Sequence, residues 1–208
     1  MRLKTNRLET LVDGIFAIVM TVLVLNFSEV FVQRAPQSER DFFLFFIQLD
    51  TNFFAYGLSF FLLGVLWLEH HRQSHFIRSV DPMFIFLNLA LLMFVSFIPL
   101  SSLMLGNHGH FLFPILAFEV NILIINVLFY AHWAYATHKH RLVHENLPAA
   151  VIVKQRRLLV FCIIFSLLAI CLADFFPVAS LLTLTITPFL MIFKMWEKIS
   201  RPEDVLGA

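Results

Sequence analysis

Charged side chains are scarce in this sequence. Asp, Glu, Lys and Arg together make up 14% of its 208 residues, whereas hydrophobic residues make up 60% and the mean hydropathy is +0.83. Soluble domains carry roughly 25% charged residues, so this composition excludes an ordinary soluble globular protein. We therefore expect an integral membrane protein of the all-α class without a soluble catalytic domain.

Cysteines and catalytic motifs are also scarce. Cys162 and Cys171 lie in one apolar segment, where they are typical of small core residues and not of a disulfide or a metal site. The sequence has no GxSxG, Walker, HExxH or CxxC motif, so no enzyme, resident metal or cofactor is expected. It also lacks TVGYG, which excludes an ion filter built as a cage of backbone carbonyls.

Long hydrophobic segments dominate the rest of the chain. No Gly/Ser-rich linker or low-complexity tract separates them, so residues 1–208 are expected to form a single six-helix domain. Pro99 is expected to bend the outer third of the third helix. Each segment is long enough to cross a hydrocarbon core of roughly 30 Å, and together they cover approximately residues 7–28, 42–68, 82–105, 111–136, 156–175 and 178–197.

Lysine and arginine are distributed unevenly between the connecting segments. With the N terminus in the cytoplasm, all of them fall on the cytoplasmic side except Arg34 and Arg40. Both termini are therefore expected to be cytoplasmic, and the basic rim should contact anionic membrane lipids. The net charge of +1 says little about soluble partners, and no nucleic-acid partner is expected.

The first apolar segment is the most informative. Its helix begins at Arg7, carries Asp13 one turn inside and has no ionisable residue after it up to residue 27. An ionisable residue at membrane depth is costly, so Asp13 needs a polar partner. Asp13 lies roughly 140° around the helix from Ile18, which belongs to a separate apolar stripe. That stripe consists of Leu11, Gly14, Ile18, Val22 and Leu25.

The second segment ends in polar residues at the same depth as Asp13. Trp67, His70 and His71 are expected to hold Asp13 or Arg7 and so to fix the apolar stripe in one orientation. Adjacent histidines point to different faces of a helix, so His70 and His71 are not the i, i+4 pair of a helical zinc site. The simpler interpretation is that these side chains only anchor the helix at the membrane interface.

A second polar stripe, on the fourth segment, contains Glu119, Asn126, Tyr130 and Trp133. Interhelical hydrogen bonds, each worth about 1 kcal/mol, are the favoured interpretation. The alternative is a proton- or cation-coupled transporter in which Glu119 and Asp50 form an ionisable relay. A membrane scaffold without transport is a third possibility.

Three blocks of sequence resemble one known family. They are RLETLVDGIFAIVMTVLVL at the start, YGLSFFLLGVLWLEHHRQSHFIRSVD at 56–81 and NLALLMFVSFIPLSSLMLG at 88–106. They look like the first three helices of prokaryotic members of the transmembrane protein 175 family, relatives of the endolysosomal potassium channel. The family motif is Arg, three variable residues and then Phe-Ser-Asp; Arg7 and Asp13 match it, whereas Leu11 and Val12 replace the phenylalanine and serine.

The resemblance implies a homotetramer in a prokaryotic plasma membrane, with the first helix of each subunit lining a central pore for K⁺ and other monovalent cations. The family's hydrophobic filter maps to Ile18, and the pore lining further out maps to Val22 and Leu25. Thr21 matches a family threonine and is expected to make interhelical hydrogen bonds.

A ring of aliphatic side chains on a pore axis resists wetting, so an ion must shed part of its hydration to pass. Potassium holds its water less tightly than sodium and should pass more easily. The expected K⁺ over Na⁺ selectivity is modest, because no oxygen cage replaces the lost water.

Overall fold

The computed structural model describes residues 6–33, 38–41, 43 and 50–186. Helices dominate this part of the chain, and a shorter apolar helix over Pro177–Ile186 follows the long ones. Within the described residues, extended pairing is limited to one antiparallel bridge between Ile77 and Val143. The main helices are α1 (Asn6–Gln33), α3 (Asp50–Ser74), α4 (Pro82–Ser96), α5 (Ile98–His108), α6 (Leu112–Thr137) and α7 (Ala149–Leu172).

Five stretches of the described chain are long and apolar enough to cross a membrane. α4 and α5 together form one of them, and the other four lie in α1, α3, α6 and α7. The sixth expected helix, 178–197, is helical in its described part, and its remainder lies outside the described residues.

Three helices extend well beyond the predicted ranges at one end. α1 continues past residue 28 to Gln33, α3 continues past residue 68 to Ser74, and α7 begins at Ala149 instead of residue 156. Hydropathy falls in these turns, but the backbone of a helix does not depend on apolar side chains. In the last turns of α3, polar side chains such as Glu69 and Gln73 are buried against other helices, which keeps the turns helical.

The third apolar segment is divided at Phe97, two residues before the proline that was expected to bend it. Pro99 has no N–H and cannot donate to the Val95 carbonyl, so the regular ladder of hydrogen bonds is interrupted here. The Phe97 N–H bonds to the Phe94 carbonyl, three residues back, at 3.1 Å. α4 ends at this point and α5 begins at Ile98.

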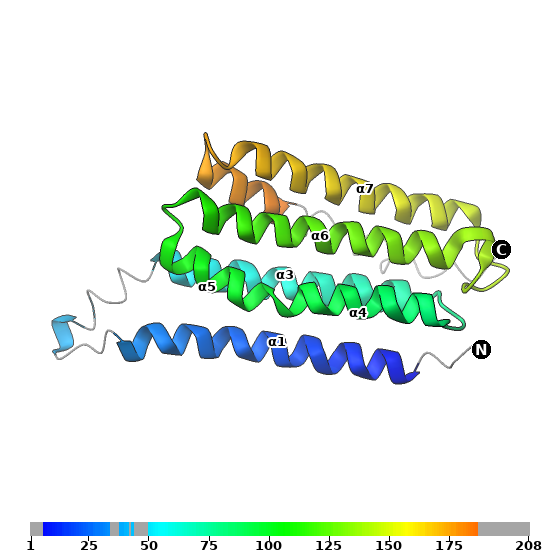
Figure 1. Ribbon diagram of the computed structural model, residues 1–208, viewed down its shortest axis with the longest axis horizontal. Coiled ribbons are helices and arrows are strands. Elements are labelled where there is room, and N and C mark those ends of the chain that lie inside the picture. Colours follow the sequence, from blue (N-terminus) through cyan, green and yellow to red (C-terminus); the bar gives the residue numbers. More distant parts are fainter. Residues whose placement is uncertain (1–5, 34–37, 42, 44–49, 187–208) are drawn as a thin grey trace, which may run out of the picture.

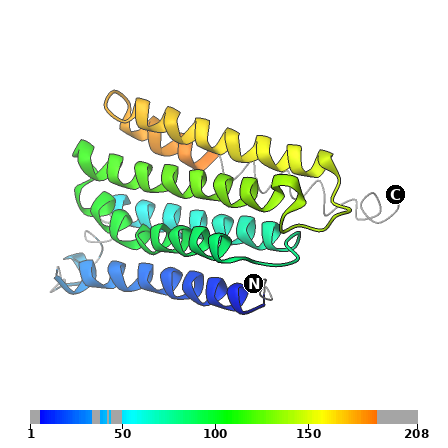
Figure 2. The same cartoon turned by 45° about the vertical axis from the view of Figure 1, so that its right-hand side comes forward.

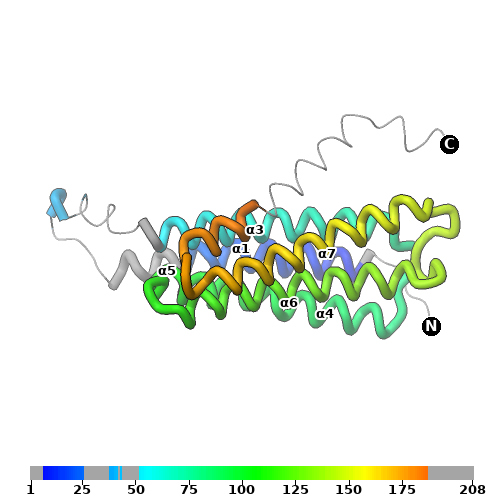
Figure 3. Tube along the Cα trace, turned by 90° about the horizontal axis from the view of Figure 1, so that it is seen from above, coloured from blue at the N-terminus to red at the C-terminus, as the bar shows by residue number. Residues whose placement is uncertain are grey.

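The long helices run side by side as an elongated bundle (Figure 1). α1 lies at one edge and packs on α3, α4 and α5, while α6 lies between the α4–α5 pair and α7 (Figures 1 and 2). The helix over Pro177–Ile186 turns back beside the end of α7 (Figures 1 and 3). α6 contributes three of the largest fully buried side chains of the core, Phe118, Phe129 and Trp133.

Asp81 fixes the junction between the end of α3 and the start of α4. Its carboxylate accepts the Phe84 N–H at 2.9 Å and the Tyr135 hydroxyl at 2.8 Å, and Pro82 occupies the first helical position. Partial burial works to raise the pKa of Asp81. The hydrogen bonds from Phe84 and Tyr135 and the nearby Arg141 cation outweigh burial, so the pKa lies below its ordinary value. Asp81 is therefore ionised at neutral pH and ties α4 to the end of α6.

The close contact of α3 with α5 at Gly106 gives a test of this packing. A Cβ atom at Gly106 would lie 3.2 Å from Asn52 Cα. We expect Gly106→Ala to lower the free energy of unfolding in detergent by roughly 1–3 kcal/mol, because α5 must move away from α3. Gly64→Ala on α3 is the matched control: no atom lies within 4 Å of its Cβ position, so this change should not destabilise. Equal effects of the two changes would contradict the packing described here.

Candidate functional site

α1 has two faces of different character. The face toward α3, α4 and α5 is buried through Val12, Phe16, Val19 and Leu23. The predicted apolar stripe lies on the opposite face, where Ile18 is 62% exposed and further positions are also accessible. Leu25 is 64% exposed, Leu11 is 42% exposed, Gly14 is exposed and Val22 is half-buried. Within this chain, the stripe therefore points away from the bundle.

Small side chains border the stripe on one side. Ala17 and Thr21 are exposed and one turn apart on α1. The Thr21 hydroxyl donates to the Ile18 carbonyl of its own helix at 2.7 Å, so the interhelical hydrogen bond expected for it is not made within the described part of the chain. Small residues spaced by four allow two helices to approach closely in a membrane.

Asp13 is held from α3. The Trp67 indole N–H donates to Asp13 Oδ1 at 2.9 Å, and the Trp67 ring stacks on the exposed His71 with a centroid distance of 5.8 Å. Of the three candidates on α3, Trp67 is thus the one that contacts Asp13. Arg7 lies exposed at the start of α1.

His70 points away from Asp13 and toward α4. Its ring is buried, and Nε2 lies 2.8 Å from Asn88 Oδ1, which can only accept a hydrogen bond. Nε2 therefore carries the hydrogen and donates it. On the other side of the ring, Nδ1 lies 3.3 Å from the Ser74 hydroxyl. His70 thus links α3 to α4 and reaches α1 only across a small gap.

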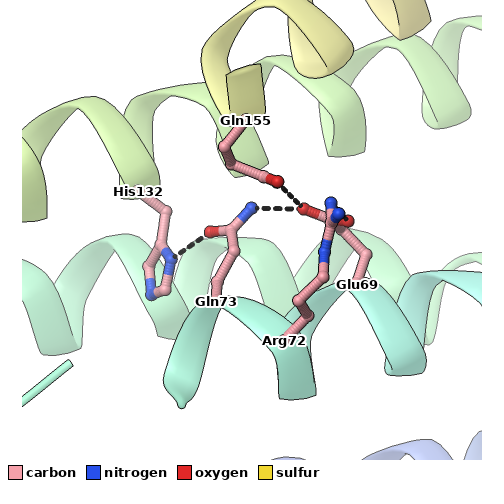
Figure 4. A network of polar contacts seen from close by, with 5 residues as sticks. All are labelled: Glu69, Arg72, Gln73, His132 and Gln155. Atoms are coloured by element: carbon pink, nitrogen blue, oxygen red, sulfur yellow. Dashed lines mark hydrogen bonds and ion pairs between the residues drawn. The ribbon is translucent and has the colours of Figure 1, made fainter. Parts of the chain in front are cut away.

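The opposite face of α3 carries a buried polar network (Figure 4). Glu69 accepts from Gln73 at 2.8 Å, from Gln155 of α7 and from Arg72, with which it also forms an ion pair. Gln73 Oε1 in turn accepts the Nδ1–H of His132 on α6 at 3.1 Å. The network shares the cost of burying the Glu69 charge and fixes α3 against α6 and α7.

This network was not predicted. Glu69, His132 and Gln155 are not among the candidate residues that the sequence indicates. The i, i+4 spacing of Glu69 and Gln73 is the one signal in the sequence, because it places two polar groups on one helix face.

The polar stripe on α6 faces α7 in part. The Asn126 amide donates to the Ser166 hydroxyl at 2.9 Å, and the Trp133 indole N–H donates to the Ile152 carbonyl at 3.4 Å. These bonds agree with the favoured interpretation of interhelical hydrogen bonding.

Glu119 differs from the rest of that stripe. It is fully buried, and neither carboxylate oxygen has a hydrogen-bond partner of normal geometry within the described residues. The Ser180 hydroxyl interacts with it electrostatically but donates its own hydrogen to the Pro177 carbonyl at 2.7 Å. Asp50, the other member of the alternative relay, is the first residue of α3, and its side chain lies outside the described part.

No group of three or more His, Cys, Asp or Glu side chains in the described part of the chain is arranged to hold a metal ion. The geometry instead provides an apolar helix face at the edge of the bundle and a polar contact between that helix and α3. These features define a multi-pass α-helical membrane protein whose first helix is supported on one side only.

The family model of the endosomal/lysosomal potassium channel TMEM175 matches residues 7–99. A potassium channel of Streptomyces collinus is 31% identical over 107 residues, which is 50% of this chain and 49% of that protein. The endosomal/lysosomal proton channel TMEM175 of Bos taurus is 35% identical over 104 residues, 48% of this chain and 22% of the relative. The aligned part thus spans half or less of these relatives.

A known crystal structure matches nearly the whole chain. The lysosomal potassium-selective channel TMEM175 homolog from Chamaesiphon minutus superposes with a TM-score of 0.72 at 23% identity, over 93% of this chain and 97% of that one. Residues 7–99 thus resemble the TMEM175 family, and the chain shares the fold of the solved homolog. Its named relatives are ion channels and not enzymes.

The contact between α1 and α3 can be tested by a double-mutant cycle. Trp67→Phe keeps an aromatic ring beside His71 but removes the N–H, and Asp13→Ala removes the acceptor. We expect each change to lower the melting temperature in detergent, and the double variant to lose roughly 0.6–1.7 kcal/mol less than the sum of the two. His71→Gln, paired with Asp13→Ala, is the control and should be additive. Additive losses for Trp67 and Asp13 would show that the hydrogen bond carries no stability.

Proposed function

We propose that the protein is a potassium-permeable cation channel, assembled from four copies of this chain with α1 of each copy lining a central pore. The proposal rests on the exposed apolar stripe of α1, which a single chain leaves at the edge of the bundle. Exposure alone does not separate a pore from lipid, because other helices also expose apolar side chains. The small residues beside the stripe and the polar contact of α1 with α3 favour the pore.

The exposed faces of α3 and α4 carry bulky aromatic and sulfur side chains, as at Phe60, Phe86 and Met93, whereas α7 exposes aliphatic ones such as Ile164 and Leu167. The exposed face of α1 has no aromatic or sulfur side chain among its described residues; it carries small and aliphatic residues instead. Ala17 and Thr21 beside the stripe suit close contact with a neighbouring copy of α1. A second copy of the chain is therefore the better occupant of this face than lipid.

The proposed mechanism is a hydrophobic constriction. Ile18 from each copy would meet on the axis, with Val22 and Leu25 further along the pore. Potassium would lose its hydration water there at a lower cost than sodium, giving modest selectivity. The Trp67–Asp13 hydrogen bond would set the rotation of α1 and hence the width of the ring. The channel would lie in the plasma membrane of a prokaryote, with the Arg7 end of α1 in the cytoplasm.

Ile18→Asn tests the constriction. Asparagine wets the ring, so K⁺ flux into liposomes should rise, about tenfold if the barrier falls by about 1.4 kcal/mol, and the K⁺/Na⁺ permeability ratio should fall toward one. Ile164→Asn on α7 is the matched control, because Ile164 is 54% exposed and lies on the outer helix. If both variants lose stability equally and neither changes the flux, Ile18 faces lipid and the constriction is wrong.

Assembly is tested by the mass of the purified protein in detergent after subtraction of bound detergent. Four copies are expected, and Asp13→Ala should lower the temperature at which the assembly dissociates, because α1 loses its anchor. A monomeric mass would contradict the assembly. If the assembly of Asp13→Ala dissociates at the same temperature as that of the unsubstituted protein, the anchoring role is wrong.

One observation favours a second candidate function, a proton-coupled transporter. Glu119 is a carboxyl at full burial with no normal hydrogen bond in the described residues, and the Bos taurus relative is named a proton channel. If Glu119→Gln abolishes transport while Ile18→Asn leaves it unchanged, this alternative replaces the channel.

A further inference from the structure

Glu119 on α6 is a carboxyl group inside the core of the bundle. It is 0% exposed, and both of its carboxylate oxygens lack a hydrogen bond within the described residues. Ser180, on the helix over Pro177–Ile186, is 0% exposed as well and interacts with Glu119. An ionised carboxylate that receives no hydrogen bond is very costly to bury, whereas the protonated acid is neutral.

The hydroxyl groups of the covering helix donate elsewhere. Ser180 donates to the Pro177 carbonyl at 2.7 Å, and Thr183 donates to another carbonyl of the same helix at 2.7 Å. The Ser59 hydroxyl of α3, which is buried too, makes no hydrogen bond to the carboxyl. Within the described residues, the negative charge of an ionised Glu119 would therefore meet no donor.

The Ser180 oxygen can instead accept a hydrogen bond. A hydroxyl has one hydrogen, which here is directed to the Pro177 carbonyl, and two lone pairs. A protonated Glu119 has one O–H to donate, and Ser180 Oγ is the acceptor beside it. Hydrogen bonds then run in one direction, from Glu119 to Ser180 to Pro177. With Glu119 ionised, two acceptors would face each other.

The neighbouring helices place no charge against Glu119. α4 and the helix over Pro177–Ile186 have no titratable side chain. On α6 itself the next titratable residue is Tyr130, about 16 Å farther along the axis, and the basic residues of α7 lie in its first three turns, at the opposite end. The titratable residues near the Glu119 end of α5 and α7 are exposed, and they are His108, His110, Cys171 and Asp174.

We propose that Glu119 is a proton-binding site of the folded protein. It is held as a neutral carboxylic acid whose O–H donates to Ser180 Oγ, so the proton joins α6 to the helix over Pro177–Ile186. When the protein unfolds, the carboxyl meets water: the O–H bond breaks, the proton passes to water or a buffer base, and a carboxylate remains. This site goes beyond the proposed channel and does not depend on K⁺ permeation.

Infrared difference spectroscopy of the purified protein in detergent tests the protonation directly, because a carboxylic acid and a carboxylate absorb at well-separated frequencies. At pH 7, the spectrum of the unsubstituted protein minus that of Glu119→Gln should contain a carboxylic acid band. Asp174→Asn, at an exposed position before the same helix, is the matched control. It should remove a carboxylate band, because an exposed aspartate is ionised at this pH. Loss of a carboxylate band in Glu119→Gln would overturn the proposal.

Ser180→Ala tests the acceptor. Burial still keeps the acid neutral in this variant, but its O–H loses the hydrogen bond, so the carboxylic acid band should remain and shift in frequency. Thr183→Val is the matched control, because the Thr183 hydroxyl donates within its own helix, and this change should leave the band in place. An unshifted band in Ser180→Ala would overturn the link between Glu119 and the covering helix.

Thermal unfolding measures the bound proton. The folded protein holds a proton that the unfolded chain releases above about pH 5, so stability should fall as the pH rises. In Glu119→Gln an amide replaces the acid, and its N–H₂ can donate to Ser180 at any pH. Relative to this variant, the melting temperature of the unsubstituted protein should fall by roughly 3–5 °C from pH 6 to pH 7.

A difference in melting temperature that is the same at both pH values would overturn the proposal. Neither spectra nor melting curves require ion flux, so a failure here is distinct from a failure of the proposed channel.

Discussion

A polar side chain that is buried in the apolar interior of this bundle is costly unless another polar group meets it. The end of α3 satisfies this requirement toward α4 and toward α6 and α7, and it makes a third polar contact, toward α1, at an exposed position. Trp67 donates to α1, His70 donates to α4, and Glu69 with Gln73 contacts α6 and α7. Apolar attraction is non-directional. These directional bonds give each helix around α3 one preferred rotation.

α1 depends most on this arrangement because it lies at the edge of the bundle. Its buried face is wholly apolar, and Asp13 provides the directional contact with α3. The exposed stripe around Ile18 lies opposite the buried face, and the hydrogen bond from Trp67 joins α1 to α3 in this rotation. In the proposed channel, Ile18 forms the constriction and Trp67 sets the rotation of α1. The two residues lie on different helices, so each can be substituted without the other.

The sequence predicts the stripe well because helical periodicity needs only one helix. It also predicts that Asp13 meets the end of the second segment, since both lie at the same depth. It does not choose between Trp67, His70 and His71, because that choice depends on how α3 is rotated. The buried polar network joins three helices through Glu69, Gln73, His132 and Gln155. The hydrophobic periodicity of one helix does not show how three helices are rotated relative to one another, so the sequence does not predict these bonds. The extra turns of α3 and α7 were missed for a related reason: hydropathy records composition and not the hydrogen bonds of the backbone.

The interruption at Phe97 has a mechanical consequence. α1 rests on α4 near its start and on α5 farther along. A single uninterrupted helix would support α1 along its whole length. The support instead consists of two helical segments, so the turns of α1 near Asp13 and those near Leu25 lie beside different ones.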